Sequence, residues 1–220
     1  MTHKIRTEDE WFAKHERTLI EDIKRERQRR ELQLAEMLKQ EEAQKRKALH
    51  WMKCSKCGSD LAEDPHYENV RIDRCTRCGG MFFDRGELEE VLLNPLEEKK
   101  TLRIGILHLV LPSWLSKDFD RSKVLEDFRI DQERRKKDVD NWLATKEGAD
   151  ARTNHWMKCP KCGSDMQEID ISYGLHLDDC TVCGGIYLDF GELETIGALT
   201  DEERKTIRDR ILSLSIPHNE

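Results

Sequence analysis

The chain has 220 residues, of which 38% are charged and only 37% hydrophobic, and its formal net charge is −7. This apolar content is low for one large core and favours small units joined by polar helices. The acidic balance argues against a general nucleic-acid binder, which carries an excess of Lys and Arg. The most apolar stretch is too short to span a bilayer, and the first residues show no apolar run typical of a secretion signal. We therefore expect a cytoplasmic protein.

The first segment is predicted to be one long charged helix. From Thr7 to Leu49 the sequence has no Pro or Gly and is rich in Glu, Lys, Arg, Gln and Leu. One helical face carries the apolar residues Trp11, Phe12, Leu19, Ile20 and Ile23. The segment Lys24–Glu31 is almost wholly charged and breaks the heptad pattern. Three interpretations stay open: a solvated helix with internal ion pairs, a coiled coil or partner-binding helix, and a basic nucleic-acid arm at Lys24–Arg30.

A motif that occurs twice follows this segment. Residues 50–60 and 155–165 share the pattern His-Trp-Met-Lys-Cys-x-Lys-Cys-Gly-Ser-Asp. In each copy, seventeen residues separate its second cysteine from the following Cys-Thr-x-Cys-Gly-Gly. Two Cys-x-x-Cys pairs at this separation are typical of a structural zinc site, in which four thiolates complete a tetrahedron. The candidate ligands, which are all the cysteines of the chain, are Cys54, Cys57, Cys75, Cys78, Cys159, Cys162, Cys180 and Cys183. The sequence therefore predicts two Zn²⁺ ions per chain.

Other uses of these cysteines are weaker. Disulfides are disfavoured because nothing else in the sequence indicates secretion. Iron or a dithiol redox cycle stays open, since four thiolates in a tetrahedron suit iron as well as zinc. A segment of about forty residues rarely buries enough apolar surface to fold alone, whereas a structural zinc site contributes an apparent ~10–16 kcal/mol in model peptides.

Short strands are predicted inside each copy. Alternation of apolar and polar residues favours strands at Val70–Asp73 and Leu175–Asp178. Two more are predicted directly after the paired glycines, at Met81–Phe83 and Ile186–Leu188. Together with the cysteine pairs, this is the plan of a zinc ribbon, in which two metal-binding turns lie at one end of a small antiparallel sheet.

A pair of carboxylates follows the last strand of each copy. Asp84 precedes Glu87 by three residues, and Asp189 precedes Glu192 by the same spacing. This is the spacing of a capping box that opens a helix. A catalytic carboxylate pair is disfavoured, because no histidine and no open metal position accompanies these residues.

The remainder is predicted to be mostly helical. Residues 102–115 are expected to pack locally, residues 116–144 to form a second charged helix, and residues 148–151 to break it before the second copy. Thr200 with Glu203 is expected to cap a last helix. The predicted segments are a charged N-terminal helix at 1–49, a first ribbon at 50–94, a helical connector at 95–154, a second ribbon at 155–198, and a C-terminal helix and tail at 199–220.

Histidine and tryptophan stand at matching places before each first cysteine. His50 and His155 could each replace a thiolate, but four cysteines already fill each tetrahedron, so a structural role is expected. Trp51 and Trp156 are expected to cover the sheet. The alternative, that they are stacking platforms for single-stranded bases, stays open.

The two copies also carry a family likeness. Met-Lys-Cys-Pro-x-Cys-Gly, followed by Cys-x-x-Cys-Gly-Gly-x-x-x-Asp-x-Gly-Glu-Leu-Glu, resembles the zinc-ribbon domain named after transcription factor IIB, in its short, mostly bacterial branch. The likeness covers residues 52–90 and 157–194, and the first copy departs from it only at Ser55, where the family usually has proline. The resemblance implies zinc, a ribbon fold and the eight cysteines as ligands. It implies no activity.

We therefore expect an α+β protein with two four-cysteine zinc ribbons, joined and preceded by long charged helices. Closed four-thiolate sites favour a non-enzymatic role as a protein-interaction or assembly module, with a protein partner or a second copy. Residues 52–93 have a charge balance of −3 and residues 157–198 a balance of −6, which disfavours nucleic acid. A nucleic-acid-binding, transcription-related factor is the alternative, and an iron or redox protein is a third, weaker possibility.

Overall fold

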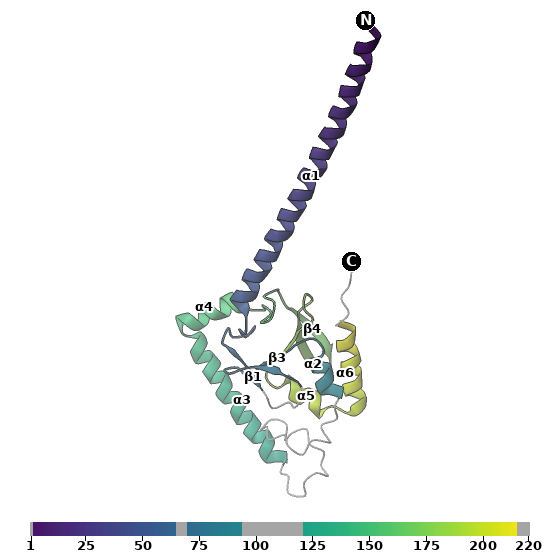
Figure 1. The fold of residues 1–220 in the computed structure, drawn as a ribbon. Coiled ribbons are helices and arrows are strands. Elements are labelled where there is room, and N and C mark those ends of the chain that lie inside the picture. The colour runs from purple at the N-terminus through teal and green to yellow at the C-terminus, as the bar shows by residue number, and fades with distance from the viewer. Residues whose placement is uncertain (1, 65–69, 94–120, 215–220) are drawn as a thin grey trace. The chain divides into compact units, whose positions relative to one another are not determined.

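The structure is a computed structural model that describes residues 2–64, 70–93 and 121–214 (Figure 1). The chain divides into two units, Met1–Lys45 and Arg46–Glu220. The elements in chain order are α1 (Thr2–His50), β1 (Leu61–Asp64), β2 (Ile72–Cys75), β3 (Met81–Phe83), α2 (Glu87–Leu93), α3 (Arg121–Leu143), α4 (Lys146–His155), β4 (Gln167–Ser172), β5 (Leu175–Asp179), β6 (Ile186–Leu188), α5 (Glu192–Ala198) and α6 (Asp201–Leu214). The mixed α+β prediction is confirmed.

Helix α1 confirms the predicted N-terminal helix; its residues up to Lys45 belong to the first unit and its last five to the second. Ion pairs along it follow the helical spacing, such as Arg30 Nε to Glu26 Oε1 at 3.1 Å and Lys45 Nζ to Glu41 Oε1 at 2.7 Å. Exposed pairs of this kind each contribute only about 0.3–0.5 kcal/mol, so they stabilise the helix modestly. Among the residues that the structure describes, no helix is long and apolar enough to cross a membrane.

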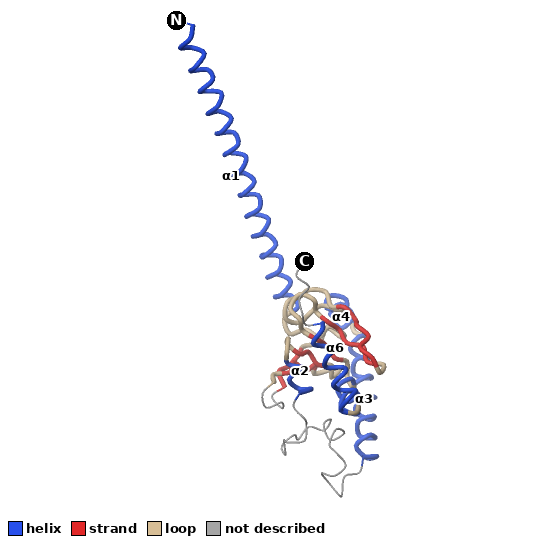
Figure 2. Tube along the Cα trace, turned by 90° about the vertical axis from the view of Figure 1, so that its right-hand side faces the viewer, coloured by secondary structure: helices blue, strands red, loops and turns tan. Residues whose placement is uncertain are grey.

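The second unit contains one antiparallel sheet to which both ribbons contribute. The strand order is β1-β2-β3-β6-β5-β4, so each ribbon supplies three neighbouring strands (red in Figure 2). The ribbons join where β3 pairs with β6, with Phe82 opposite Tyr187. These two residues are 105 positions apart, which is also the offset between the two copies of the motif. The two ribbons are therefore related by an approximate two-fold axis through the β3–β6 pair, an arrangement that the sequence alone does not reveal.

Most of the strands agree with the predictions. Strands β3 and β6 are confirmed, β5 is one residue longer than expected, and β2 begins two residues later than the predicted Val70–Asp73. The edge strands β1 and β4 lack a counterpart in the predictions. Both carry several charged residues on their exposed face, as edge strands commonly do, which weakens their apolar signal.

The two faces of the sheet bury different groups, because successive side chains of a strand point to opposite sides. On one face, Met81 and Phe83 of β3 belong to an apolar core, which also includes Leu88 of α2, Ile196 of α5 and Ile207 of α6. On the other face, the core contains the cysteines. It also includes Leu61, Phe82, Met166 and Tyr187. Helices α2, α5 and α6 thus back the sheet on the side away from the cysteine clusters, whereas Val139 of α3 packs on the cysteine side.

Two glycines let the aromatic rings cross between the ribbons. A Cβ atom on Gly80 would lie 2.1 Å from the Tyr187 hydroxyl oxygen, and one on Gly185 would lie 2.3 Å from Cζ of Phe82. Both rings are fully buried, so neither can move aside. The second glycine of each Gly-Gly pair is therefore required by the aromatic ring of the other ribbon, in addition to any requirement of the turn that follows the cysteines.

The prediction that residues 148–151 break the connector helix is wrong. The break lies earlier, between α3 and α4, where the Thr145 hydroxyl accepts a hydrogen bond from the Gly148 amide at 3.0 Å. Gly148 lies inside α4. Only glycine fits at this position, because a Cβ atom there would come within 1.9 Å of the Trp142 carbonyl oxygen. The helical part predicted at 116–144 is confirmed by α3 from residue 121. The predicted local packing of residues 102–115 lies outside the described residues.

Candidate metal centres

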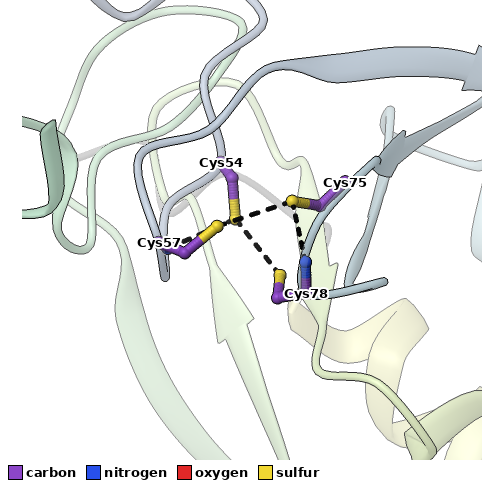
Figure 3. A group of neighbouring side chains, drawn as sticks. All are labelled: Cys54, Cys57, Cys75 and Cys78. Carbon is purple, nitrogen blue, oxygen red and sulfur yellow. Dashed lines mark hydrogen bonds between the residues drawn. The ribbon is translucent and has the colours of Figure 1, made fainter. Parts of the chain in front are cut away.

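The first ribbon gathers four cysteine sulfurs at one end of the sheet (Figure 3). Cys54 and Cys57 precede β1, Cys75 ends β2, and Cys78 precedes β3. The Sγ atoms of Cys54 and Cys78 are 3.6 Å apart, and those of Cys57 and Cys75 are 3.5 Å apart. A disulfide would need about 2.05 Å, whereas a tetrahedron with metal–sulfur bonds of about 2.3 Å has edges of about 3.8 Å. The spacing therefore fits a four-coordinate metal ion.

The backbone of each turn is shaped for sulfur ligands. The amides of Lys56 and Cys57 both donate to Cys54 Sγ at 3.4 Å. Gly58 then closes the turn with a φ of 72° and donates to the Cys54 carbonyl at 2.9 Å. A positive φ strains residues with a Cβ atom, so glycine is required at this point.

The second ribbon repeats this geometry. The Sγ atoms of Cys159 and Cys183 are 3.5 Å apart, as are those of Cys162 and Cys180. All four sulfurs lie within 4.8 Å of one another, as they do in the first cluster. The structure thus brings the eight predicted ligands together in two sets of four, each set from one copy of the motif.

The charge of these clusters requires a cation. Burial raises the pKa of the Cys54 thiol, and the neighbouring Cys180 and Cys183 raise the pKa of Cys159. Four thiols at contact distance in a largely buried cluster cannot all ionise unless a positive charge lies among them. A divalent ion that prefers thiolates supplies this charge and leaves no open coordination position. Both donor sets therefore suit structural zinc.

A comparison with protein families decides the assignment. The transcription factor zinc-finger family matches residues 53–94 and again residues 158–198. Each matched stretch contains one complete four-cysteine cluster.

Both ribbons are transcription factor zinc-finger domains. No curated protein and no solved structure matches the chain. The chain thus carries two zinc-finger ribbons, with sites for two zinc ions.

Each zinc-finger ribbon extends a lysine into the other. Lys56 Nζ lies 2.8 Å from Asp178 Oδ2, and Lys161 Nζ lies 3.0 Å from Asp73 Oδ2 and 3.1 Å from Asp84 Oδ2. Asp73 and Asp178 are almost fully buried. Burial raises the pKa of Asp178, but the Lys56 ammonium opposes this effect, and at 2.8 Å we assign the pair as ionised. These lysines lie inside the metal-binding turns, between the two cysteines, so the turn of one zinc finger neutralises a buried carboxylate of the other.

The lysines that cross the interface could have been noticed in the sequence. Lys56 and Lys161 occupy the same place in the two copies, as do Asp73 and Asp178. A repeated charge is a weak signal by itself, since most lysines and aspartates lie in water. Only the pairing of β3 with β6 shows that the two sets face each other.

The two histidines meet at the pseudo-two-fold axis. His50 Nδ1 lies 2.9 Å from His155 Nδ1, and both rings are buried. Burial lowers the pKa of both imidazoles, so one neutral ring donates to the lone pair of the other. Neither histidine belongs to a cysteine cluster. Their place between the ends of α1 and α4 is consistent with the structural role that the sequence predicts.

The tryptophans are placed differently from the prediction that they cover the sheet. Trp51 is 47% exposed and Trp156 is 44% exposed. The Lys161 ammonium lies 5.4 Å from the Trp51 ring centre, and the Lys56 ammonium lies 5.6 Å from that of Trp156. Each indole therefore packs against the lysine that crosses from the other zinc finger. Each ring also has a nearer cation from the helix before it, Lys47 at 5.2 Å from Trp51 and Arg152 at 4.6 Å from Trp156.

The predicted capping box is confirmed in full at Thr200 and Glu203, whereas the two boxes that follow the last strands are confirmed only for their glutamates. The N-cap of α5 is Gly191, which makes no side-chain cap hydrogen bond. A Glu87 carboxylate oxygen accepts from the Asp84 amide, and one of Glu192 accepts from the Asp189 amide, both at 2.6 Å. Thr200 and Glu203 satisfy each other's backbone amides at the start of α6. These carboxylates stabilise the starts of helices.

Replacing Ser55 by proline is expected to stabilise the protein by about 0.5–1 kcal/mol. The second zinc finger has Pro160 at the matching position, so the backbone there accepts proline. The buried Ser55 hydroxyl also has no hydrogen-bond partner among the described residues. The melting temperature of the zinc-loaded protein measures the effect. The reverse change, Pro160→Ser, should destabilise by a similar amount, and a destabilised Ser55→Pro variant would contradict this account.

Replacing Glu192 by glutamine is expected to stabilise the protein increasingly as the pH rises. Burial raises the pKa of Glu192 from its ordinary 4.5 to about 7, so the folded state holds the proton more tightly than the unfolded state. Stability therefore falls as the pH rises from about 4.5 to about 7, because only the unfolded state ionises freely. A glutamine side chain at this position would keep one carbonyl oxygen for the short hydrogen bond from the Asp189 amide and would have no charge to bury. Melting temperatures at about pH 6 and about pH 8 should show a larger gain at the higher pH.

Glu203 provides a control with the opposite sign. Hydrogen bonds from Thr200 lower the pKa of Glu203, so its stabilising contribution is present at neutral pH and is lost in acid. Glu203→Gln should therefore destabilise at both pH values. An identical pH profile for Glu192→Gln and wild type would contradict the assignment.

Proposed function

We propose that the protein is a non-enzymatic zinc protein that acts as a protein-interaction or assembly module. In this proposal the paired zinc fingers form a folded base, and α1 binds a protein partner or a second copy of the chain. The observation that carries it is the set of large apolar side chains exposed on α1.

The exposed apolar side chains share one helical face. Phe12 is 63% exposed, and Leu19, Ile20 and Ile23 are each at least 44% exposed. They are seven, eight and eleven residues after Phe12, which places them on one side of the helix. Trp11 extends this face and stacks on His15, with their ring centres 3.8 Å apart. An apolar stripe of this kind is what a helix presents to a groove or to another helix.

The chemistry of the zinc sites supports a role without catalysis. A tetrahedral ion held by four thiolates has no open position for a substrate or an activated water. The zinc supplies folding energy in such a site, and the cysteines hold and shield it. The repeated carboxylates already serve as helix caps.

Nucleic-acid binding is less well supported. The basic cluster of α1 is internally neutralised, because Arg25 pairs with Asp22, and Arg29 and Arg30 both lie near Glu26. The zinc fingers are acidic, and each four-thiolate zinc site adds two negative charges.

The proposal is tested on the full zinc-loaded chain by measuring its mass in solution and by photo-crosslinking in cells from a probe at position 20. We expect assembly or a reproducible protein crosslink, and loss of either in the double variant Phe12→Glu, Ile20→Glu. The matched control is Gln28→Glu with Ala35→Glu, which adds two carboxylates on the opposite side of the helix. A monomer without crosslinks would overturn the proposal. Salt-sensitive binding to DNA or RNA would replace it with the transcription-related alternative.

A further inference from the structure

The first zinc site receives a hydrogen bond from the second zinc finger. The Tyr187 hydroxyl on β6 lies 2.9 Å from Cys54 Sγ and 3.5 Å from Cys78 Sγ. The side chain is completely buried and rests on Gly80, which fixes the ring. A cysteine that ligates a metal ion is a thiolate without a proton, so at this distance the Tyr187 hydroxyl is the donor and the Cys54 sulfur accepts. One zinc finger thus contributes a donor to the metal site of the other.

The second zinc site receives no such donor from the matching position. The residue 105 positions before Tyr187 is Phe82, which is also fully buried and rests on Gly185. The two rings therefore occupy equivalent places across the pseudo-two-fold axis. Their chemical difference is a single hydroxyl group, directed at the first cluster.

The two sites also differ in how they are covered. Cys57 is buried, and its carbonyl oxygen accepts a hydrogen bond from Trp142 Nε1 of α3 at 3.1 Å. The Arg77 guanidinium, between the cysteines of the second pair, lies 4.5 Å from the centre of the Trp142 ring. Val182 takes the place of Arg77 in the second zinc finger and is 69% exposed. Cys78 and Cys183 are partly buried in both sites, but Cys162, the counterpart of the buried Cys57, is also partly exposed.

We propose that the two zinc sites are unequal, with the first releasing zinc slowly and the second exchanging it readily, and that Tyr187 is a positioning residue that establishes this difference. A hydrogen bond to a ligating thiolate fixes its orientation and offsets part of its charge, and loss of such an outer partner typically costs 10–100-fold in metal affinity. The partly exposed second site is also easier for a competing ligand to approach. This inference concerns zinc exchange and is independent of the proposed role of α1.

The test follows zinc release from the full chain, loaded with two zinc ions, to an excess of the chromogenic chelator 4-(2-pyridylazo)resorcinol. Two phases of equal amplitude are expected. Brief labelling with N-ethylmaleimide during the fast phase, followed by peptide mass spectrometry, should modify Cys159 and Cys162 before Cys54 and Cys57. The variant Tyr187→Phe should accelerate the slow phase at least about tenfold and leave the fast phase unchanged.

The reciprocal variant separates positioning from general loosening. Phe82→Tyr places a hydroxyl at the second site and should slow the fast phase. The double swap Tyr187→Phe, Phe82→Tyr should exchange the labelling order of the two sites. A single release phase, earlier labelling of Cys54 and Cys57, or a slow phase unaffected by Tyr187→Phe would overturn the proposal. Equal acceleration of both phases would also overturn it, because it would indicate a purely structural role.

Discussion

Replacing Cys57 by alanine is expected to remove one zinc ion and to lower the free energy of unfolding by at least about 5 kcal/mol. Cys57 is buried and its sulfur lies 3.5 Å from that of Cys75, so no nearby water can take its place without opening the cluster. The loss should extend to the second zinc finger, because Lys56 of the same turn holds the buried Asp178. Native mass spectrometry measures the zinc content, and amide hydrogen exchange measures the opening of β3 and β6.

Two further variants are compared with Cys57→Ala. Cys162→Ala removes the corresponding ligand of the second site and should have an effect of the same kind. Thr76→Ala lies between the cysteines of the first cluster, but Thr76 is exposed, so it should retain both zinc ions and nearly full stability. A Cys57→Ala protein that still holds two zinc ions would contradict the ligand assignment. Unchanged exchange in β6 would contradict the coupling between the zinc fingers.

Replacing Lys161 by methionine is expected to destabilise the protein by about 2–4 kcal/mol. The change leaves the Asp73 carboxylate, whose side chain is only 7% exposed, without the ammonium that lies 3.0 Å away. An unpaired buried charge costs about 3–5 kcal/mol, and the partial exposure of Lys161 reduces this figure. Adding Asp73→Asn should recover part of the loss. Guanidinium unfolding of the wild type, both single variants and the double variant gives the coupling energy.

Lys158 is the matched control for Lys161. It lies in the same turn and pairs with Asp165, whose side chain is 79% exposed. Lys158→Met should therefore cost less than about 1 kcal/mol. If Lys161→Met were as mild as Lys158→Met, the crossing ion pair would not stabilise the interface.

The sequence predicts the zinc fingers well because their determinants are local. Cysteine pairs at a fixed separation have few alternative uses, and the capping boxes place two interacting groups three residues apart. The short strands β3 and β6 follow from the turn that precedes them. The edge strands β1 and β4 and the position of Gly148 escaped prediction, because tertiary contacts outweigh local preference there.

The joining of the zinc fingers depends on contacts between residues far apart in the chain. Nothing local to Phe82 or Tyr187 shows that they lie opposite each other. The sequence shows that Tyr187 and Phe82 differ by a hydroxyl group. Only the fold shows that this hydroxyl lies within hydrogen-bond distance of Cys54 Sγ. The ligands of a small metal domain can thus be predicted, whereas the surroundings that tune each site require the fold.

The β3–β6 pair has a consequence for the doubled sequence. In a ribbon on its own, β3 would be an edge strand with unpaired backbone groups. It would pair with a second ribbon only when the ribbon concentration exceeds the dissociation constant of the pair. Placing both ribbons in one chain makes this association intramolecular, at an effective concentration in the millimolar range for flexible tethers. Dilution therefore cannot separate the pair. The same edges also allow two chains to exchange ribbons, so refolding at high protein concentration should yield some interlocked dimers, each with two complete sheets.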